Sequence, residues 1–390
     1  MNETWIVDAV RTPFGKFGKV FQNVSGVELG RIVVDYMLRN HEIDKEEVNE
    51  VIMGNVIGAG LGQNPARQIA LKSGLPSKVG AFTVNKVCGS GLKSIILGTQ
   101  AIKTGDVDVV IAGGIENMSQ APHLIKGYRW DNRYDDEKLV DSLIHDGLWD
   151  AFDDIHMMTT GEIVAEKYKI TRERADEFAY LSHQKAIEAT DRGELDNEIV
   201  EVEIKTDGKK KIIKHDQGMR RDTTLEKLSY LKPLLGKGII TAGNSSQMSD
   251  GAAGVILMNK DKAKELGLHP LAKIISYSTS GVPPSQVMES PIIAVKKLLK
   301  SVNLDINQID LFEHNEAFAT ASLAISDQLK IKIDRLNVRG GAISIGHPLG
   351  ASGARLVISL LNSLRDRGLR RGIATLCMGG GNGLAILITR

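Results

Sequence analysis

The chain has 390 residues, of which 42% are hydrophobic and 25% charged, values typical of a globular protein with two or three packed units. Its formal net charge is +1, so no overall field attracts nucleic acid or an anionic membrane. No apolar stretch of about 18 residues is present to span a bilayer, and the first residues lack the pattern of a leader. We therefore expect a cytoplasmic chain with no nucleic-acid or membrane partner.

Strand and helix patterns alternate through the first 118 residues. Alternating apolar residues predict strands, and apolar residues at helical spacing predict helices. The expected order is strand 5–9, helix 27–39, strand 50–56, helix 65–73, strand 82–84, helix 90–103 and strand 107–112. This alternation predicts an α/β fold with a largely parallel, helix-covered sheet.

The pattern changes between residues 119 and 248. Acidic and aromatic residues cluster at 130–136 and 149–154, and a helix is predicted over 172–192. The lysine run 209–211 lies in a predicted hairpin turn, where such charges are solvated. We interpret this segment as an insertion, because strand–helix alternation resumes only at a predicted strand over 252–258.

The last third of the chain resembles the first third in layout. Segments 84–114 and 337–381 each predict a strand, a turn of small residues, a helix, a strand and a glycine pair. The matching points are 89–91 with 351–353, and 113–114 with 379–380. This weak internal repeat predicts two similar halves that face each other, with a site at their junction.

Cys88 is the first candidate catalytic residue. In VNKVCGSGLKS (84–94) a short strand ends at Cys88 and small residues open a helix. Free N–H groups at a helix N-terminus favour an anion, so we expect the pKa of Cys88 to fall below the ordinary value of about 8.5. The alternative is that Cys88 is a buried, inert apolar residue.

Two further candidates lie in glycine-rich turns. His347, in GGAISIGHPLGASGAR (340–355), is placed as a general base that activates a thiol. Cys377, in TLCMGGGNG (375–383), is followed by glycines whose N–H groups suit an oxyanion hole. A second cysteine suits proton transfer if Cys88 is the nucleophile. The alternatives are a structural histidine and a core cysteine.

The fourth candidate segment is EHNEAFA (313–319). A run of four polar residues there interrupts an apolar, helical context, which indicates a site, since buried polar groups need partners. The alternative is a solvated helix start. Ligands of open α/β sheets gather at strand ends. The chain lacks a phosphate loop, a dinucleotide fingerprint and cysteines at zinc spacing, so we expect no metal and no cofactor.

Together these segments resemble the thiolase family, and the likeness covers essentially the whole chain. Further segments that carry it are RTPFGKFG (11–18), GNVIGAGLGQNPARQ (54–68), GGIENMSQAPH (113–123) and TAGNSSQMSDGA (241–252). The resemblance implies a thiolase fold, in which two similar βαβαβαββ halves form a five-layered αβαβα core. The halves would be 1–118 with 249–270, and 271–390; 119–248 would be an inserted loop domain that binds CoA.

The resemblance also implies a reaction, the reversible condensation of two acetyl-CoA molecules to acetoacetyl-CoA and CoA by a ping-pong mechanism. Cys88 would carry the acyl group as a thioester after His347 removes its proton. Cys377 would move the proton of the α-carbon. Asn315 would hold a water that completes one oxyanion hole, and the N–H groups of Cys88 and Gly379 would form the other.

Substrate-binding residues follow from the same resemblance. The family's CoA and pantetheine tunnel is matched by His156, Met157, Arg220 and Ser246. Met288 occupies a position where short-chain members also have Met, and there it would narrow the acyl pocket. His314 is a departure, because many acetoacetyl-CoA thiolases have a small or apolar residue before the Asn; we place His314 with the substrate-binding residues.

Other functions remain open from the sequence. One is a longer-chain 3-ketoacyl-CoA thiolase of fatty-acid breakdown. A non-catalytic acyl-CoA-binding homologue would not need all four candidate catalytic side chains, and a Cys–His hydrolase would not need Cys377. The expected partners are acetyl-CoA, acetoacetyl-CoA, CoA and further copies of the chain, in a homodimer or homotetramer. Family tetramers make contacts in the region of residues 126–134.

Overall fold

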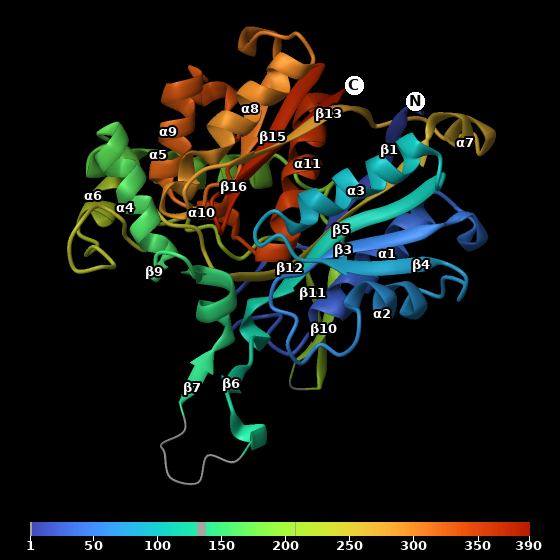
Figure 1. The fold of residues 1–390 in the computed structure, drawn as a ribbon, viewed down its shortest axis with the longest axis horizontal. Coiled ribbons are helices and arrows are strands. Elements are labelled where there is room, and N and C mark those ends of the chain that lie inside the picture. Colours follow the sequence, from blue (N-terminus) through green and yellow to red (C-terminus); the bar gives the residue numbers. More distant parts are fainter. Residues whose placement is uncertain (1, 131–137, 207) are drawn as a thin grey trace.

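The computed structural model describes residues 2–130, 138–206 and 208–390, and its main feature is a ten-stranded mixed sheet (Figure 1). The N-terminal strands are β1 (Thr4–Arg11), β2 (Gly15–Lys16), β3 (Glu50–Gly54), β4 (Gly80–Val84), β5 (Val109–Asn117) and β12 (Ser249–Asn259). The C-terminal strands are β13 (Ala272–Gly281), β14 (Leu311–His314), β15 (Arg371–Met378) and β16 (Asn382–Thr389). These positions confirm the strands predicted in the first third of the chain and at 252–258. The expectation of a largely parallel sheet is wrong, because among the described strands of this sheet only β3 with β4, β3 with β5, and β14 with β15 pair in parallel.

The sheet consists of two leaves, since β1 and β13 pair only at Trp5 with Lys273 and at Ile6 with Ala272. Both leaves follow the same pairing scheme. In the first, β3 and β5 are parallel, and β12 lies antiparallel between β5 and β1. In the second, β14 and β15 are parallel, and β16 lies antiparallel between β15 and β13. The predicted repeat is therefore confirmed at the level of topology.

Three layers of helices accompany the two leaves. Helices α1 (Gly26–Asn40) and α2 (Pro65–Lys72) cover the N-terminal leaf, and α8 (Ser290–Ser301) and α9 (Ala319–Leu329) cover the C-terminal leaf. Helices α3 (Ser90–Thr104) and α11 (Leu349–Asp366) share one apolar cluster with strands of both leaves. The five-layered αβαβα core is thus confirmed, with α3 and α11 as its central layer.

The central layer depends on backbone contact without side chains. A methyl group on Gly91 of α3 would lie 2.7 Å from the carbonyl oxygen of Gly350 on α11, and one on Gly114 of β5 would overlap the same oxygen. Only glycine permits such an approach. This corrects the proposed match of glycine pairs: residues 113–114 lie inside β5, which runs on to Asn117, whereas residues 379–380 form the turn after β15.

The segment between β5 and β12 packs mainly on the C-terminal leaf. Helices α4 (Met157–Tyr168) and α5 (Arg172–Asp191) contact α9, and α5 confirms the predicted helix. The predicted hairpin consists of β10 (Val202–Thr206) and β11 (Lys209–Ile213). The lysine run 209–211 is exposed as expected, but it lies on β11 rather than in the turn. Residues 131–137, which include most of one acidic and aromatic cluster and part of the family's tetramer-contact region, lie outside the described residues.

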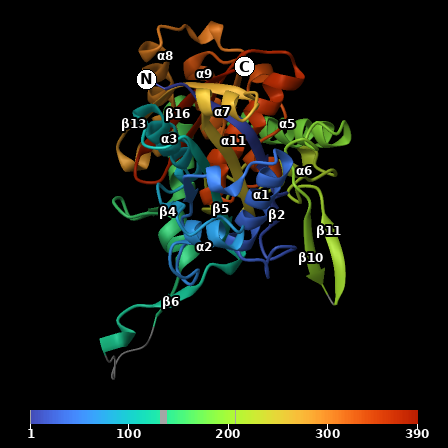
Figure 2. The ribbon, with the colours of Figure 1, turned by 90° about the vertical axis from the view of Figure 1, so that its right-hand side faces the viewer.

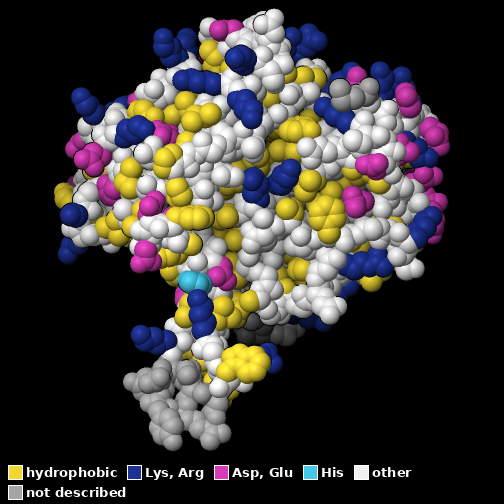
Figure 3. All heavy atoms as spheres, in the orientation of Figure 1, with side chains coloured by type: hydrophobic (Ala, Val, Ile, Leu, Met, Phe, Trp, Pro, Cys, Tyr) yellow, Lys and Arg dark blue, Asp and Glu magenta, His cyan; other side chains and the backbone are white. Residues whose placement is uncertain are grey.

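The remaining elements are short. They are β6 (His123–Ile125), β7 (Leu139–Asp141), β8 (Trp149–Asp150), β9 (Ile155–His156), α6 (Leu225–Ser229), α7 (Lys260–Glu265) and α10 (Ala342–Ile345). Figure 2 shows that the β10–β11 hairpin and the arm carrying β6 extend beyond the sheet on different sides. Figure 3 shows acidic and basic side chains interspersed around the rim of one face, with apolar side chains toward its middle. Among the described helices, none combines the length and apolarity that crossing a bilayer requires.

A buried ion cluster joins β1 to the inserted segment. Arg11 donates from Nη1 and Nη2 to the two carboxylate oxygens of Asp216, at 2.7 and 2.8 Å, and from Nε to Glu198 at 2.9 Å. All three side chains have no exposed side-chain surface. Removal of the cation would leave two carboxylates buried without it, which is costly in a medium of low dielectric constant. Arg11 of the RTPFGKFG segment thus has a structural role.

We predict that Arg11→Met lowers the free energy of unfolding by about 3–5 kcal/mol, because it breaks a buried ion cluster. Denaturant unfolding followed by circular dichroism measures the change. Lys78→Met is the matched control: Lys78 pairs with Glu46 at 2.7 Å, but both side chains are more than 60% exposed (63% and 62%), so its loss should leave the transition unchanged. Equal effects of the two substitutions would contradict the prediction.

Candidate functional site

Two adjoining cavities lie where the two halves of the core meet. The inner cavity, of about 60 Å³, is lined by both cysteines, Cys88 and Cys377, together with His347 and Met288. The outer cavity, of about 260 Å³, is lined by His156 and other residues of the inserted segment. Both cavities share six lining residues, so they form one path: Leu148, Met157, Ser246, Phe318, His347 and Leu349.

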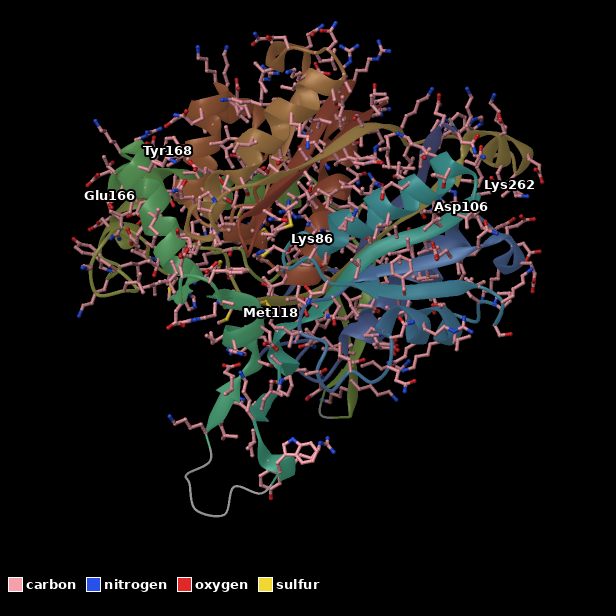
Figure 4. The ribbon with its side chains drawn as sticks, viewed as in Figure 1. Lys86, Asp106, Met118, Glu166, Tyr168 and Lys262 are labelled. Carbon is pink, nitrogen blue, oxygen red and sulfur yellow. The ribbon has the colours of Figure 1, made fainter. Side chains whose placement is uncertain are left out.

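The inner cavity collects residues from distant parts of the chain. Cys88 lies two residues before α3, Cys377 lies near the end of β15, and His347 lies two residues before α11. The three predicted residues are therefore brought together by the packing of the central layer. Figure 4 shows Lys86, two residues before Cys88, at the junction of the two halves, and Met118, which lines the outer cavity, near the start of the inserted segment.

The pKa of the Cys88 thiol is raised, contrary to the expectation from its position before a helix. Burial is the largest cause, and the neighbouring Cys377 adds to it. The N–H groups of Cys88 and Gly379 act in the opposite direction, but burial outweighs them. Burial also raises the pKa of Cys377 to about 12. Both thiols are therefore protonated in the resting protein at neutral pH.

His347 is neutral and its tautomer is fixed. Ser352 Oγ donates its proton to the carbonyl of Pro348 at 2.8 Å and lies 2.5 Å from His347 Nδ1, so the hydrogen of that pair is on Nδ1. Asn315 Nδ2 donates to Nε2 at 3.2 Å. Burial and the nearby Arg355 guanidinium lower the pKa of His347 to about 3. Nε2 is thus the basic nitrogen, and its lone pair takes a proton once the hydrogen bond from Asn315 is exchanged for the proton donor.

The polar run 313–316 ends a strand rather than interrupting a helix. Its four side chains are 0–1% exposed, so the solvated helix start is excluded. Asn315 contacts His347, and its Oδ1 has no hydrogen-bond partner within the residues that the structure describes. Glu313 pairs with Arg355 of α11 at 3.0 Å, which ties the end of β14 to the helix that follows His347. The run therefore lines neither cavity, but it contacts His347 and α11 and so holds them in place.

His314 does not line either cavity, so the expectation that it contacts substrate is not met. Its ring turns into the interior, where Nδ1 lies 2.9 Å from Ser322 Oγ of α9. Burial and the Arg355 guanidinium lower the pKa of His314 to about 3, so it is a neutral core residue. A strand alternates the direction of successive side chains, which places His314 and Asn315 on different sides.

Glu116 is a supporting residue that sequence reasoning missed. Its carboxylate accepts hydrogen bonds from Asn55 Nδ2 at 2.8 Å, from the N–H groups of Val56 and Ile57 at 3.1 and 3.2 Å, and from the N–H of Gly350 at 2.8 Å. It thereby ties the start of α11 to the N-terminal half. Burial raises the pKa of Glu116 to about 7. In the sequence, Glu116 is one acidic residue in GGIENMSQAPH (113–123), and no pattern there distinguishes it.

The predicted substrate-binding residues divide into two groups. His156, Met157 and Ser246 line the outer cavity, and Met288 closes the inner one, with its sulfur 3.6 Å from that of Cys377. Arg220 lines neither cavity; its N–H donates to His183 Nδ1 at 3.2 Å. Leu148, Val287, Phe318 and Leu349 are among the lining residues that the prediction missed. They are ordinary apolar residues with no distinguishing sequence signal.

The described part of the chain contains no group of three or more His, Cys, Asp or Glu side chains placed to hold a metal ion. The polar side chains that line the inner cavity are the two thiols, the imidazole of His347 and the hydroxyl of Ser246. Such groups can form a thioester, move protons and stabilise an oxyanion.

Comparisons with known proteins agree with this geometry. Residues 4–261 match the thiolase N-terminal domain, and residues 268–390 match the thiolase C-terminal domain. A probable acetyl-CoA acyltransferase of Staphylococcus epidermidis is 48% identical, over 100% of this chain and 99% of its own length. A probable acetyl-CoA acyltransferase of Staphylococcus aureus is 46% identical, over 100% of both chains.

Solved structures give the same picture. The acetyl-CoA acetyltransferase of Bacillus anthracis superposes with a TM-score of 0.98 at 40% identity, covering 100% of this chain and 99% of that one. Human mitochondrial 3-ketoacyl-CoA thiolase superposes with a TM-score of 0.96 at 38% identity, covering 100% and 98%.

We predict that alkylation of Cys88 by iodoacetamide is slow at pH 7 and rises about tenfold per pH unit to pH 9 without a plateau. The reason is that a raised pKa leaves the thiolate a small fraction throughout this range, whereas an ordinary thiol begins to level off. Peptide mass spectrometry follows the modified residue, and Cys88→Ala serves as the control for its assignment. A plateau below pH 8 would instead indicate a resting thiolate.

Proposed function

The chain belongs to the thiolase family of acyltransferases, and we propose that it catalyses the reversible condensation of two acetyl-CoA molecules to acetoacetyl-CoA and CoA. The observation that carries this proposal is the presence of Cys88, Cys377 and a neutral His347 in one cavity of about 60 Å³. One thiol cannot hold an acyl group and move an α-proton at the same time. Two thiols beside one base meet that requirement.

In the first half-reaction, Cys88 becomes acetylated. His347 Nε2 takes the thiol proton as the sulfur attacks the thioester carbon of acetyl-CoA. The N–H groups of Cys88 and Gly379 donate hydrogen bonds to the carbonyl oxygen and stabilise its developing negative charge. When the intermediate collapses, the carbon–sulfur bond to CoA breaks and the imidazolium returns the proton to the leaving thiolate. The products are acetyl-Cys88 and CoA.

Proton transfer from Cys88 to His347 is unfavourable in the resting protein, because the thiol pKa is raised and the imidazole pKa is lowered. Attack on a bound thioester changes this balance. The charge then resides on the carbonyl oxygen, where two N–H groups stabilise it, rather than on a buried sulfur. Deprotonation is therefore coupled to substrate binding, and the nucleophile is protected while the site is empty.

In the second half-reaction, Cys377 acts at the α-carbon. Its thiol first gives its proton to His347 Nε2, and the resulting thiolate takes the α-proton of a second acetyl-CoA. The carbanion attacks the carbonyl carbon of acetyl-Cys88, and the Cys88 sulfur leaves and receives the proton of the imidazolium, so that both thiols and the neutral His347 are restored. A pKa of about 12 makes the Cys377 thiolate a strong base, and makes its thiol the donor to the enolate in the thiolytic direction. Asn315 would hold a water that stabilises the enolate oxygen.

The CoA portion would occupy the outer cavity. We propose that His156, Met157 and Ser246 contact pantetheine, and that Arg220 meets a phosphate group nearer the nucleotide end. Its neighbourhood supports this: Gln247, which lines the outer cavity, donates to the carbonyl of Gly218, two residues before Arg220, at 2.9 Å. Residues 119–248 would then serve as a CoA-binding domain, in a cytoplasmic homodimer or homotetramer.

A short acyl chain is favoured by the walls of the inner cavity. Val287 and Met288 lie at the end of the 3₁₀ segment Pro284–Glu289, are 1% and 3% exposed, and close the cavity beside Cys377. The alternative, a longer-chain 3-ketoacyl-CoA thiolase of fatty-acid breakdown, requires the flexible Met288 side chain to move aside.

We predict that thiolysis of 3-ketoacyl-CoA substrates falls steeply beyond four carbons. Coupled assays with substrates of increasing length measure kcat/KM for the parent protein and for Met288→Ala. The substitution should extend activity to longer chains because it removes the closing wall. A parent protein that prefers long chains would establish the alternative function.

We predict that Cys377→Ala still releases one equivalent of CoA from acetyl-CoA as Cys88 is acetylated, but loses condensation by about 10²–10⁴-fold, since it removes a proton-transfer group. Rapid-quench measurement of CoA and acetoacetyl-CoA separates the two steps. Full condensation activity in this variant would exclude the assigned role of Cys377.

A further inference from the structure

Val87, the residue before the nucleophile, has an unusual backbone conformation. Its φ is +48°, in the left-handed region. The other non-glycine residues with positive φ in the described part of the chain are Asn, Asp, Glu or Lys, so Val87 alone is β-branched. A β-branched residue rarely adopts this conformation, and it persists only where its surroundings impose it.

Hydrogen bonds on both sides impose the conformation. The N–H of Val87 donates to Asn85 Oδ1 at 2.9 Å, and its carbonyl accepts from Ser90 Oγ at 2.6 Å. Ser90 Oγ in turn accepts from the N–H of Lys86 at 2.8 Å. The turn before Cys88 is therefore closed by two side chains, and the backbone of Val87 has no freedom to relax.

The Val87 side chain packs against the turn that follows Cys377. A methyl group on Gly379 would lie 3.4 Å from Val87 Cγ1, an ordinary van der Waals distance, so the isopropyl group lies on the side of Gly379 where a Cβ would be. Two further contacts hold the same turns together. A methyl group on Gly89 would lie 2.5 Å from Met378 Sδ, and Lys86 Nζ donates to Asn382 Oδ1 at 3.0 Å. Lys86 marks this junction in Figure 4.

The contacts between these turns lie next to two N–H groups of the site. The N–H groups of Cys88 and Gly379 belong to opposite halves of the core, yet both lower the pKa of the Cys88 thiol against the effect of burial. No covalent link sets their separation. Stabilisation of an oxyanion requires donors held within a few tenths of an ångström of a fixed geometry. The contacts between the two turns meet that requirement, and Val87 contributes the one that lies beside Gly379 itself.

We propose that Val87 is a positioning residue, whose left-handed backbone places its side chain beside Gly379 and so helps to set the spacing of the two oxyanion-hole N–H groups. This inference rests on the proposed function, in which those groups stabilise the thioester oxygen. Val87 also contacts two apolar clusters. A purely packing role would make loss of its side chain a matter of stability rather than of turnover.

The test compares variants at Val87 with a matched control. Val87→Gly removes the side chain and relieves the backbone, Val87→Ala removes the side chain alone, and Val87→Thr keeps the β-branched shape. Val84→Ala, three residues earlier on β4, removes the same atoms from a partly buried valine that is not among the atoms nearest Gly379. For each, kcat and KM of acetoacetyl-CoA thiolysis and the melting temperature Tm are measured.

We expect Val87→Gly and Val87→Ala to lower kcat by about tenfold or more, the scale of a weakened oxyanion hole, while KM stays within about threefold. Val87→Thr and Val84→Ala should keep the parent kcat within about threefold. The loss of kcat should not parallel a fall in Tm, because Val87→Gly removes backbone strain as well as the side chain.

The proposal is overturned if Val87→Gly and Val87→Ala keep the parent kcat, or if kcat falls only in proportion to lost folded protein, as judged by Tm and by Val84→Ala. A parent protein without thiolase activity would overturn the proposed function itself, which is a distinct result. Should Val87→Gly not fold, Val87→Ala and Val87→Thr still decide the question.

Discussion

The close approach of α3 to α11 is the constraint on which the site depends. Because Gly91 and Gly350 carry no side chains, the two helices meet backbone to backbone at the centre of the core. This contact brings the start of each helix to the same place, and with it Cys88 from one half and His347 from the other. The carboxylate of Glu116 then fixes the start of α11 through Gly350. A larger residue at either glycine would push the two halves apart and would thereby move the catalytic groups away from each other.

Burial sets the chemistry of the assembled site. In water the thiols of Cys88 and Cys377 and the imidazole of His347 would titrate near neutral pH. In the core the thiol pKa values rise and the imidazole pKa falls, so each group rests in its uncharged form. An uncharged site buries two cysteines and a histidine at low cost. Transfer of the Cys88 proton to His347 therefore depends on the bound thioester, whose oxygen accepts hydrogen bonds from the N–H groups of Cys88 and Gly379.

Much of the fold and part of the site were predictable from sequence, because they depend on local patterns. Periodicity identified strands such as β1 and β3 and helices such as α3, and small residues beside Cys88, His347 and Cys377 marked the turns. Features that depend on distant contacts were not predictable. The pKa of Cys88 was assigned the wrong direction because a helix start is visible in sequence and burial is not. His314 was placed with substrate because its orientation depends on Ser322 of α9. The role of Glu116 depends on its partners in two other segments.

The central claim is that Cys88 alone carries the acyl group while Cys377 beside it remains a free thiol. Brief exposure of the protein to acetyl-CoA, an acid quench and peptide mass spectrometry test this most directly. The account predicts one acetyl group per chain, on Cys88, that added CoA removes again. An acetyl group on Cys377, or no covalent acetyl group while acetoacetyl-CoA still forms, would contradict it.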